Sequence, residues 1–231
     1  MTELNVVGLG PGSVDHVTLK ALQVLRESEI IYVPISGGEN KIARRIVEEL
    51  MHRYTFIEHS EIIELEFPMT RNREYNKIHW EKSIEDIFNS FLNHSYISYA
   101  VLGSPIFFST FNHISSDLRK KGVNIRYIPG MNSVDACAAL ASIQIGHGND
   151  AILTTTYSRI FNFEKIGEYD TIILLKVPEG SSAISKIRER FPDFKSVTYS
   201  RRCTMVNQQI TAEPGDDEGD YFSMIIMRRE N

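Results

Sequence analysis

The sequence predicts an α/β protein with two domains, the first built on a mainly parallel sheet and the second on a mixed sheet. In the first half of the 231-residue chain, short apolar segments alternate with segments of helical periodicity, and parallel strands require such crossover helices. After Pro129, strand-like segments follow one another almost directly, which favours a mixed sheet. The length allows one large domain or two small ones. We place the boundary between residues 129 and 130.

The first domain, residues 1–129, shows the alternation most clearly. The expected strands are residues 4–8, 30–34, 62–66, 96–102 and 124–128. Helices are expected between them, at residues 17–27, around 42–47, at 76–93 and near 110–121. The third helix carries apolar residues at the i, i+3, i+4, i+7, i+8 spacing of a helix packed on a sheet: Ile84, Ile87, Phe88, Phe91 and Leu92. Parallel strands joined by crossover helices follow from this order.

The second domain, residues 130–231, begins with a helix of small residues at 133–142 (SVDACAALAS), which permits close backbone packing. Strands are expected at 151–156, 171–177, 196–202, 205–212 and 221–227, with one further helix near 181–191. The acidic segment 213–220 (EPGDDEGD) lacks the regular ligand spacing and the terminal Glu of a calcium loop. Because it lies between two strand patterns, we interpret it as a hairpin loop.

Composition excludes several classes of protein. The formal charge of −5 argues against a general nucleic-acid binder, which must neutralise phosphates with Lys and Arg. No apolar run approaches the ~20 residues that span a bilayer, and the chain begins without a signal-peptide pattern. Cys137 and Cys203 are isolated, so they imply neither a disulfide framework nor a Cys-based metal site, and the scattered histidines predict no protein-bound metal. These features predict a cytoplasmic enzyme.

The loop from Gly8 to Ser13 (GLGPGS) has the shape of a nucleotide-binding turn. Ser13 stands where a dinucleotide loop needs its third glycine, and the second strand (IIYVP) ends without the acid that binds a ribose. The Gly-Lys-Ser/Thr of a phosphate-binding loop is absent too. Pro11 removes an amide from the corner of the loop, so an uncharged or cationic ligand suits it better than a pyrophosphate. An ordinary strand-to-helix turn remains the alternative.

Four stretches, taken in order, carry a resemblance to a known family. They are GLGPG with the TLKALQVLRESEIIYVP that follows it, LGSPIFFSTF (102–111), YIPGMNSVDACAAL (127–140) and IILLKVPEG (172–180). Together they resemble the tetrapyrrole methylases, S-adenosylmethionine-dependent enzymes that act on corrin and sirohaem precursors. The segment FPMTRNRE (67–74) is similar to the branch that methylates C-20 of precorrin-2 or of cobalt-factor II. The resemblance therefore implies a homodimeric C-20 methyltransferase of cobalamin biosynthesis.

The resemblance also implies a cofactor site. In the family, S-adenosylmethionine lies folded in the cleft between two domains and is held largely by backbone groups. Matched by position, the binding residues would be Pro11, Leu102, Gly103, Ser104, Phe107, Asn132, Ser133 and Leu175. Taken by themselves, Phe107 and Leu175 would be core residues. Ser104 stands where the family usually has Asp, so any role of that carboxylate is in doubt, although backbone contacts of the loop could survive.

Arg71 and Arg73 are the substrate candidates. Precorrin-2 bears acetate and propionate side chains, and Arg recognises carboxylates through a bidentate fork. A protein of negative net charge needs such a local positive patch to bind a polyanion. A solvated loop is the alternative for these residues, and Arg201 with Arg202 is a weaker pair of the same kind.

The proton acceptor at C-20 is not identified by the sequence. Glu74, Tyr75 and His79 lie near the FPMTR segment, although each is also compatible with a structural role.

Three alternatives remain open for the function. The first is a family member that acts on another substrate, such as a diphthine precursor or ribosomal RNA. The FPMTR segment and the acidic charge speak against RNA. A non-catalytic protein that binds S-adenosylmethionine or a tetrapyrrole is the second, because of Ser104. The third, a nicotinamide-dependent oxidoreductase, is weakened by the missing third glycine and the missing acid.

Overall fold

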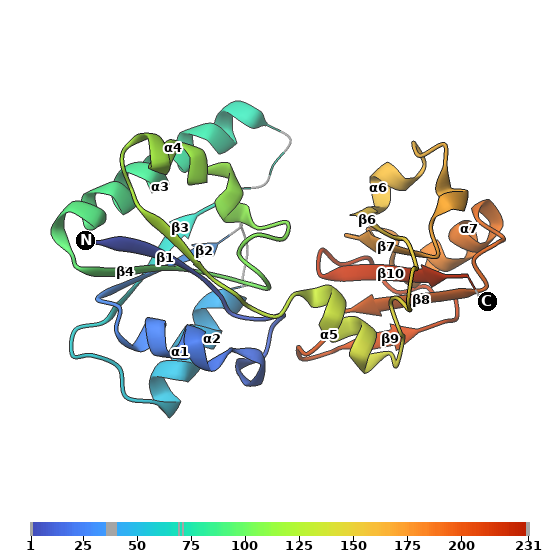
Figure 1. Ribbon diagram of the computed structural model, residues 1–231, viewed down its shortest axis with the longest axis horizontal. Helices are drawn as coiled ribbons and strands as arrows, with labels where there is room; N and C mark the ends of the chain where they lie inside the picture. The colour runs from blue at the N-terminus through green and yellow to red at the C-terminus, as the bar shows by residue number, and fades with distance from the viewer. Residues whose placement is uncertain (1, 36–40, 69, 71, 230–231) are drawn as a thin grey trace. The chain divides into compact units, whose positions relative to one another are not determined.

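The computed structural model describes residues 2–35, 41–68, 70 and 72–229 (Figure 1). The chain divides into two compact units, Met1–Asn132 and Ser133–Asn231, so the division falls after Asn132 rather than after residue 129. In the described ranges each unit contains a five-stranded sheet, parallel in the first unit and mixed in the second. This arrangement confirms the predicted fold class.

The sheet of the first unit has the strand order β3-β2-β4-β1-β5, and all its pairings are parallel. Its strands are β1 Glu3–Gly8, β2 Ile30–Ile35, β3 Glu61–Glu66, β4 Tyr96–Val101 and β5 Ile125–Ile128. Each lies where the apolar segments of the sequence predict it. Parallel strands share one direction, so the carboxyl ends of all five meet at one edge of the sheet.

Helices cover both faces of this sheet, α1 (Leu19–Arg26) and α2 (Ile42–Arg53) on one face and α3 (Arg73–Asn93) and α4 (Ser115–Lys120) on the other (Figure 1). The Thr18 hydroxyl caps α1 by accepting a hydrogen bond from the Ala21 amide at 3.1 Å, which sets the start of the helix. The helix expected near 110–121 is divided, because a 3-10 turn, η2 (Thr110–His113), precedes α4.

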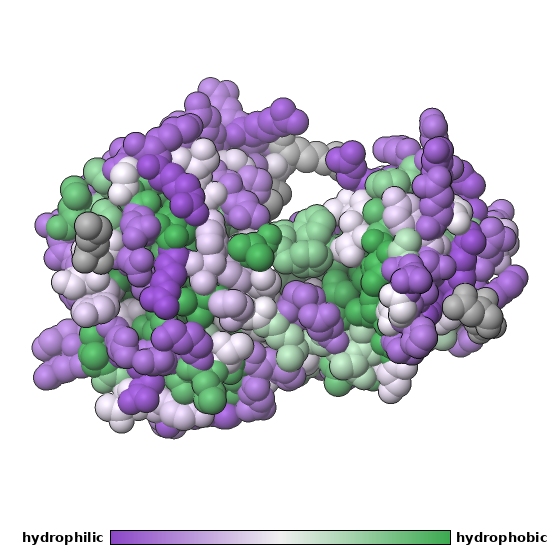
Figure 2. Space-filling model, viewed as in Figure 1, coloured by the Kyte–Doolittle hydropathy of each residue, from purple (hydrophilic) through white to green (hydrophobic). Residues whose placement is uncertain are grey.

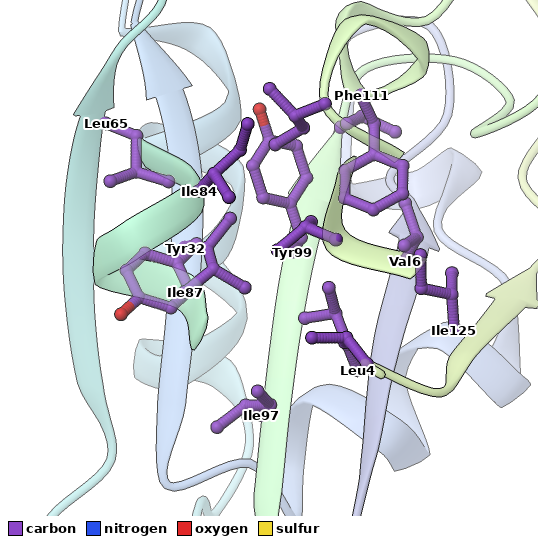
Figure 3. Close-up of a cluster of buried hydrophobic side chains, with 14 of the residues drawn as sticks. Leu4, Val6, Tyr32, Leu65, Ile84, Ile87, Ile97, Tyr99, Phe111 and Ile125 are labelled. Atoms are coloured by element: carbon purple, nitrogen blue, oxygen red, sulfur yellow. The ribbon is translucent and has the colours of Figure 1, made fainter. Parts of the chain in front are cut away.

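Large apolar side chains fill the space between the sheet and α3 (Figure 3). Tyr32, Tyr99 and Phe111 are among the largest fully buried side chains, and Ile84 and Ile87 of α3 pack among them. The Tyr32 hydroxyl is hydrogen-bonded to the Ser90 hydroxyl at 2.7 Å, so this buried polar group is satisfied. Each such apolar side chain contributes about 1.5–3 kcal/mol by leaving water, and the sheet is therefore a stable platform for the loops at its edge.

The sheet of the second unit has the order β6-β7-β10-β8-β9. Its strands are β6 Ile152–Thr156, β7 Thr171–Leu175, β8 Ser196–Arg201, β9 Gln209–Thr211 and β10 Ser223–Arg228, and its helices are α5 Ser133–Leu140, α6 Tyr157–Ile160 and α7 Ala183–Arg190. Every residue of β7 is buried, because alternate side chains enter two clusters on opposite faces. This double burial accounts for the unbroken apolar run of that strand. The short helix α6 was not expected, since four residues carry no periodicity.

The acidic segment 213–220 is not a hairpin loop, so that interpretation is wrong. β9 and β10 both pair antiparallel with β8, one on each side of it, and they are therefore parallel to each other. A hairpin cannot join parallel strands. The segment instead holds carboxylates used inside the unit: Asp217 accepts a hydrogen bond from the Ser181 amide at 3.0 Å, and Asp220 is paired with Arg202 at 2.5 Å.

Cys137 and Cys203 are not isolated, which corrects a second expectation. They form a disulfide with their Cα atoms 5.4 Å apart, linking α5 to the turn that follows β8. Both residues are buried. The sequence carried no sign of the pairing, because 66 positions separate the two cysteines and the sheet brings them together.

The visible face of each unit is largely hydrophilic, with apolar side chains exposed among the polar ones (Figure 2). Among the residues that the structure describes, no helix is long and apolar enough to cross a membrane.

Candidate active site at the carboxyl edge of the parallel sheet

The connections of β1 and β4, which are neighbours, leave the sheet in opposite directions. The chain passes from β1 through α1 to β2 on one side, and from β4 through α4 to β5 on the other. Two adjacent strands with diverging connections form a topological switch point, and open α/β sheets bind ligands in the crevice outside the carboxyl ends of such strands. The loops 9–13 and 102–109 leave these two ends. The first unit therefore has its natural binding position at the two loops that the sequence singled out.

Backbone contacts between glycines build this edge. A Cβ on Gly130 would lie 2.5 Å from the Gly103 oxygen, and one on Gly8 would lie 2.7 Å from the Gly130 Cα. The Gly103 amide donates a hydrogen bond to the Gly10 oxygen at 2.7 Å, and both residues have positive φ, +70° and +79°. Only glycine permits this approach and these backbone angles without strain. The chain segments after β1, β4 and β5 are thus held together by main-chain atoms.

The predicted residues of these loops have different exposures. Pro11 is buried, while Leu102, Gly103 and Ser104 are half-buried. The Phe107 side chain is 36% exposed, so it is not the core residue that its type alone suggests. It contacts the Phe108 ring at 5.0 Å between centroids.

The loop after β4 carries an apolar surface. Ile106 and Phe108 are 68% and 50% exposed on either side of Phe107. The Ser109 hydroxyl then accepts a hydrogen bond from the Phe111 amide at 3.3 Å and caps η2, which fixes the end of the loop. Exposed aromatic side chains on a fixed loop are typical of a ligand-binding surface.

The remaining cofactor candidates lie around the division between the units. Asn132 ends the first unit, whereas Ser133 begins α5 and Leu175 ends β7 in the second. Leu175 is buried in a cluster that also contains Val134 and Cys137 of α5. The second unit therefore packs the helix that starts at Ser133 against the face of β7 that carries Leu175.

The FPMTR segment follows β3 and so leaves the sheet at the same edge. Arg71 lies outside the described residues, and Arg73 is the exposed first residue of α3. Buried Asn76 organises the turn: its Oδ1 accepts hydrogen bonds from the Thr70 amide at 3.2 Å and the Thr70 hydroxyl at 2.8 Å, and its Nδ2 donates to the Thr70 oxygen at 2.8 Å. Sequence reasoning missed Thr70 and Asn76, whose role shows only when the turn is closed.

An aromatic and imidazole cluster joins α3 to the segment after loop 102–109. The Trp80 ring stacks on His113 of η2 at 4.4 Å and on Phe67 at 5.6 Å. His79, the residue before Trp80 in α3, has its Nδ1 3.0 Å from Glu66 Oε2 at the end of β3. Of the candidate proton acceptors, Glu74 and Tyr75 are exposed, and His79 is the one with a carboxylate beside it.

Burial and hydrogen bonding shift the pKa values of Tyr99 in the first unit and of Asp217 in the second. Burial raises the pKa of Tyr99, on β4, which therefore stays neutral in the platform. Burial also acts to raise the pKa of Asp217, but hydrogen bonds from Ser181, together with the backbone amide of Asp217 itself and the charge of Arg201, outweigh it and the pKa is lowered. Arg201 lies 4.0 Å from Asp217, and Arg202 is paired with Asp220. This second arginine pair is thus engaged with the acidic segment of its own unit.

The described ranges show no candidate metal centre. They contain no group of three or more His, Cys, Asp or Glu side chains that could hold a metal ion.

Known proteins are similar to this chain in sequence or in fold. A protein of Methanocaldococcus jannaschii named "Probable cobalt-precorrin-2 C(20)-methyltransferase" is 30% identical over 230 residues, which cover 96% of this chain and 94% of that protein. The precorrin-2 C(20)-methyltransferase of Sinorhizobium sp is 24% identical over 235 residues, covering 96% and 93%. The solved structure of uroporphyrin-III C-methyl transferase from Thermus thermophilus, complexed with S-adenyl homocysteine, has a TM-score of 0.64 at 16% identity, covering 98% and 97%. The family model of the tetrapyrrole (corrin/porphyrin) methylases matches residues 3–217, and the chain belongs to that family.

Proposed function

We propose that this protein transfers a methyl group from S-adenosylmethionine to C-20 of precorrin-2 or cobalt-factor II in cobalamin biosynthesis. The observation that carries the proposal is the 30% identity, over 96% of the chain, to a relative named as a cobalt-precorrin-2 C(20)-methyltransferase. A second relative, at 24% identity, is named for the same position of precorrin-2. The segment 67–74, which resembles that branch of the family, follows β3 at the edge where the glycine loops lie.

The residues at the switch point fit the methyl donor. Pro11 has no amide N–H that could donate to a phosphate. Because the glycines are closely packed and carry no side chains, a ligand here would contact mainly main-chain groups. The exposed Phe107 and Phe108 rings suit a cationic ligand, since a positive charge is attracted to an aromatic face. Residues that would hold the donor are Pro11, Leu102, Gly103, Ser104, Phe107, Asn132, Ser133 and Leu175. When bound, the donor supplies an electrophilic methyl group on a sulfonium.

Ser104 is compatible with activity in this proposal. The neighbouring Gly103 reaches Gly10 through a main-chain hydrogen bond, which does not depend on the side chain at position 104. We therefore expect Ser104→Asp to change turnover by less than about tenfold, that is, by less than about 1.4 kcal/mol. A large gain of turnover would instead indicate a degenerate site and favour the non-catalytic alternative.

The substrate is a polyanion, and the chain must bind it despite a net charge of −5. Arg73 stands exposed at the start of α3 and can meet a carboxylate with a bidentate fork. We propose the same role for Arg71. Once the macrocycle is positioned and water is excluded, the electron-rich carbon itself is the nucleophile, so that orientation supplies much of the rate. We further propose a cytoplasmic homodimer.

The test is a methyl-transfer assay with labelled S-adenosylmethionine and both macrocycles, precorrin-2 and cobalt-factor II, under anaerobic conditions. We expect label in one of them with loss of the C-20 proton by NMR. Arg73→Ala should raise the KM for the macrocycle, whereas Lys77→Ala, the removal of another exposed cation of α3, should leave it unchanged. Label in neither macrocycle, with S-adenosylhomocysteine still bound in calorimetry, would refute the substrate and retain the cofactor.

A further inference from the structure

We propose that His79 accepts the proton released from C-20 and that Glu66 positions its imidazole. This inference rests on the proposed function, because it concerns the second half of that reaction. In the first half, C-20 forms a bond to the methyl group while the sulfur–methyl bond breaks and its electron pair stays on sulfur. C-20 then carries both hydrogen and methyl, and the macrocycle carries a positive charge. Breaking the C-20–H bond returns its electron pair to the macrocycle, and the proton needs a base.

His79 has the surroundings of such a base. It lies in the second turn of α3, with its Nδ1 3.0 Å from Oε2 of Glu66, the last residue of β3. The His79 side chain is 21% exposed, so it is neither fully buried nor free in solvent. The Tyr75 ring packs against the imidazole at 4.6 Å between centroids and limits its rotation. The ring is thus contacted on two sides, by the carboxylate of Glu66, whose side chain is 71% exposed, and by an aromatic face.

The Glu66 carboxylate determines which nitrogen of the His79 imidazole is free to accept a proton. An acceptor beside Nδ1 favours the tautomer with hydrogen on Nδ1, which leaves the Nε2 lone pair to take a proton. After the transfer, the imidazolium and the Glu66 carboxylate have opposite charges at ion-pair distance. Glu74 and Tyr75, the other candidates of this segment, are exposed side chains, and Tyr75 serves His79 as a packing partner.

The position of His79 also matches the candidate site. Glu66 ends β3 at the sheet edge where the loops after β1 and β4 begin. The next residue, Trp80, stacks on His113 of η2, and η2 directly follows the exposed loop 102–109. This contact holds the second turn of α3 against the segment that carries the aromatic loop. A macrocycle seated over that loop would therefore have the imidazole at its margin.

The test compares His79→Gln and Glu66→Gln with His52→Gln, which alters an exposed histidine near the end of α2. Turnover is measured with precorrin-2 or cobalt-factor II carrying hydrogen or deuterium at C-20. General-base catalysis contributes about 10²–10⁴-fold, so His79→Gln should lower turnover by that factor. Its isotope effect should rise above that of the wild type, because proton removal becomes rate-limiting. Glu66→Gln should show a smaller loss in the same direction, and His52→Gln should show neither change.

Two outcomes would overturn the proposal. One is wild-type turnover in His79→Gln. The other is a loss of turnover with an unchanged isotope effect and weakened S-adenosylhomocysteine binding, which would indicate a structural role. An inactive wild-type protein would refute the proposed function itself, and this result is distinguishable because it does not depend on the variant.

Discussion

The substitution Gly130→Ala tests whether main-chain contact between glycines builds the candidate site. The new Cβ would lie 2.5 Å from the Gly103 oxygen and 2.7 Å from the C and Cα atoms of Gly8. These atoms belong to the backbone and cannot swing aside as a flexible side chain can. Ordinary contact begins at 3.4 Å, so the closest pair must separate by 3.4 − 2.5, or about 0.9 Å. Overpacking of this kind costs about 1–3 kcal/mol, and three contacts place this variant near the upper end.

The same displacement should reduce activity more than stability alone explains. The atoms that must move belong to Gly8 and Gly103, which carry the two loops of the switch point. Misplacing a site by about 1 Å can cost about 10²-fold in rate. We therefore expect turnover to fall about 10²-fold at a temperature where the variant is still folded, with weaker binding of S-adenosylhomocysteine.

The stability of the first unit can be followed by urea unfolding with the fluorescence of Trp80, the single tryptophan of the sequence. Gly167→Ala, in the second unit, is the control for the substitution itself, because its Cβ would meet only the Arg229 side chain at 3.7 Å. Its stability, followed by circular dichroism, should change by less than about 0.5 kcal/mol. Unchanged stability and unchanged ligand affinity in Gly130→Ala would refute the argument from backbone contact.

Three further predictions concern other parts of the chain. Cys137→Ala opens a disulfide across 66 positions, so the chain-entropy relation predicts a loss of about 4 kcal/mol, and equal urea midpoints by circular dichroism would contradict it. Asn76→Ala removes the bonds that close the turn at Thr70, and it should cost about 1–3 kcal/mol and raise the KM for the macrocycle without weakening S-adenosylhomocysteine binding. The hydrogen bond from His94 lowers the pKa of Glu29 below its ordinary 4.5; the stabilisation is therefore complete above pH 4.5 and is lost as the pH falls through the lowered value. Urea titrations on either side of pH 4.5 should show this loss in the wild type and a reduced loss in Glu29→Gln.

The parallel half of the fold could be predicted because local sequence determines it. Each strand of the first unit is a short apolar run, and each crossover helix has its own periodicity or cap, as Thr18 provides for α1. The position of the candidate site follows in the same way, since the glycine-rich loop after β1 and the LGSP loop after β4 stand out in the sequence. No partner strand had to be known for either step.

The second unit was harder to predict from the sequence. The two wrong predictions there concern which strands pair and which cysteines pair. The pattern at 205–212 and 221–227 indicates two strands, although the first is confined to Gln209–Thr211, and it does not show that both pair with β8. Consecutive strands suggested a hairpin, and the sheet placed β8 between them. The disulfide was missed for the same reason, since Cys137 and Cys203 meet only after α5 packs on the sheet. Composition and spacing do not contain such long-range pairings.

The candidate site could be predicted less fully than the parallel sheet but more fully than the pairings of the second unit. Its residue types could be identified one by one, whereas their roles depend on contacts that form only in the fold. His79 was one of three nearby titratable residues in the sequence, and it differs from the others because the end of β3 places Glu66 beside it. Gly130 was part of the stretch YIPGMNSVDACAAL in the sequence, and its need for glycine follows from the approach of Gly8 and Gly103. We expect a site built from backbone groups to tolerate changes of side chain such as Ser104, provided that the glycines which bring the backbones together remain.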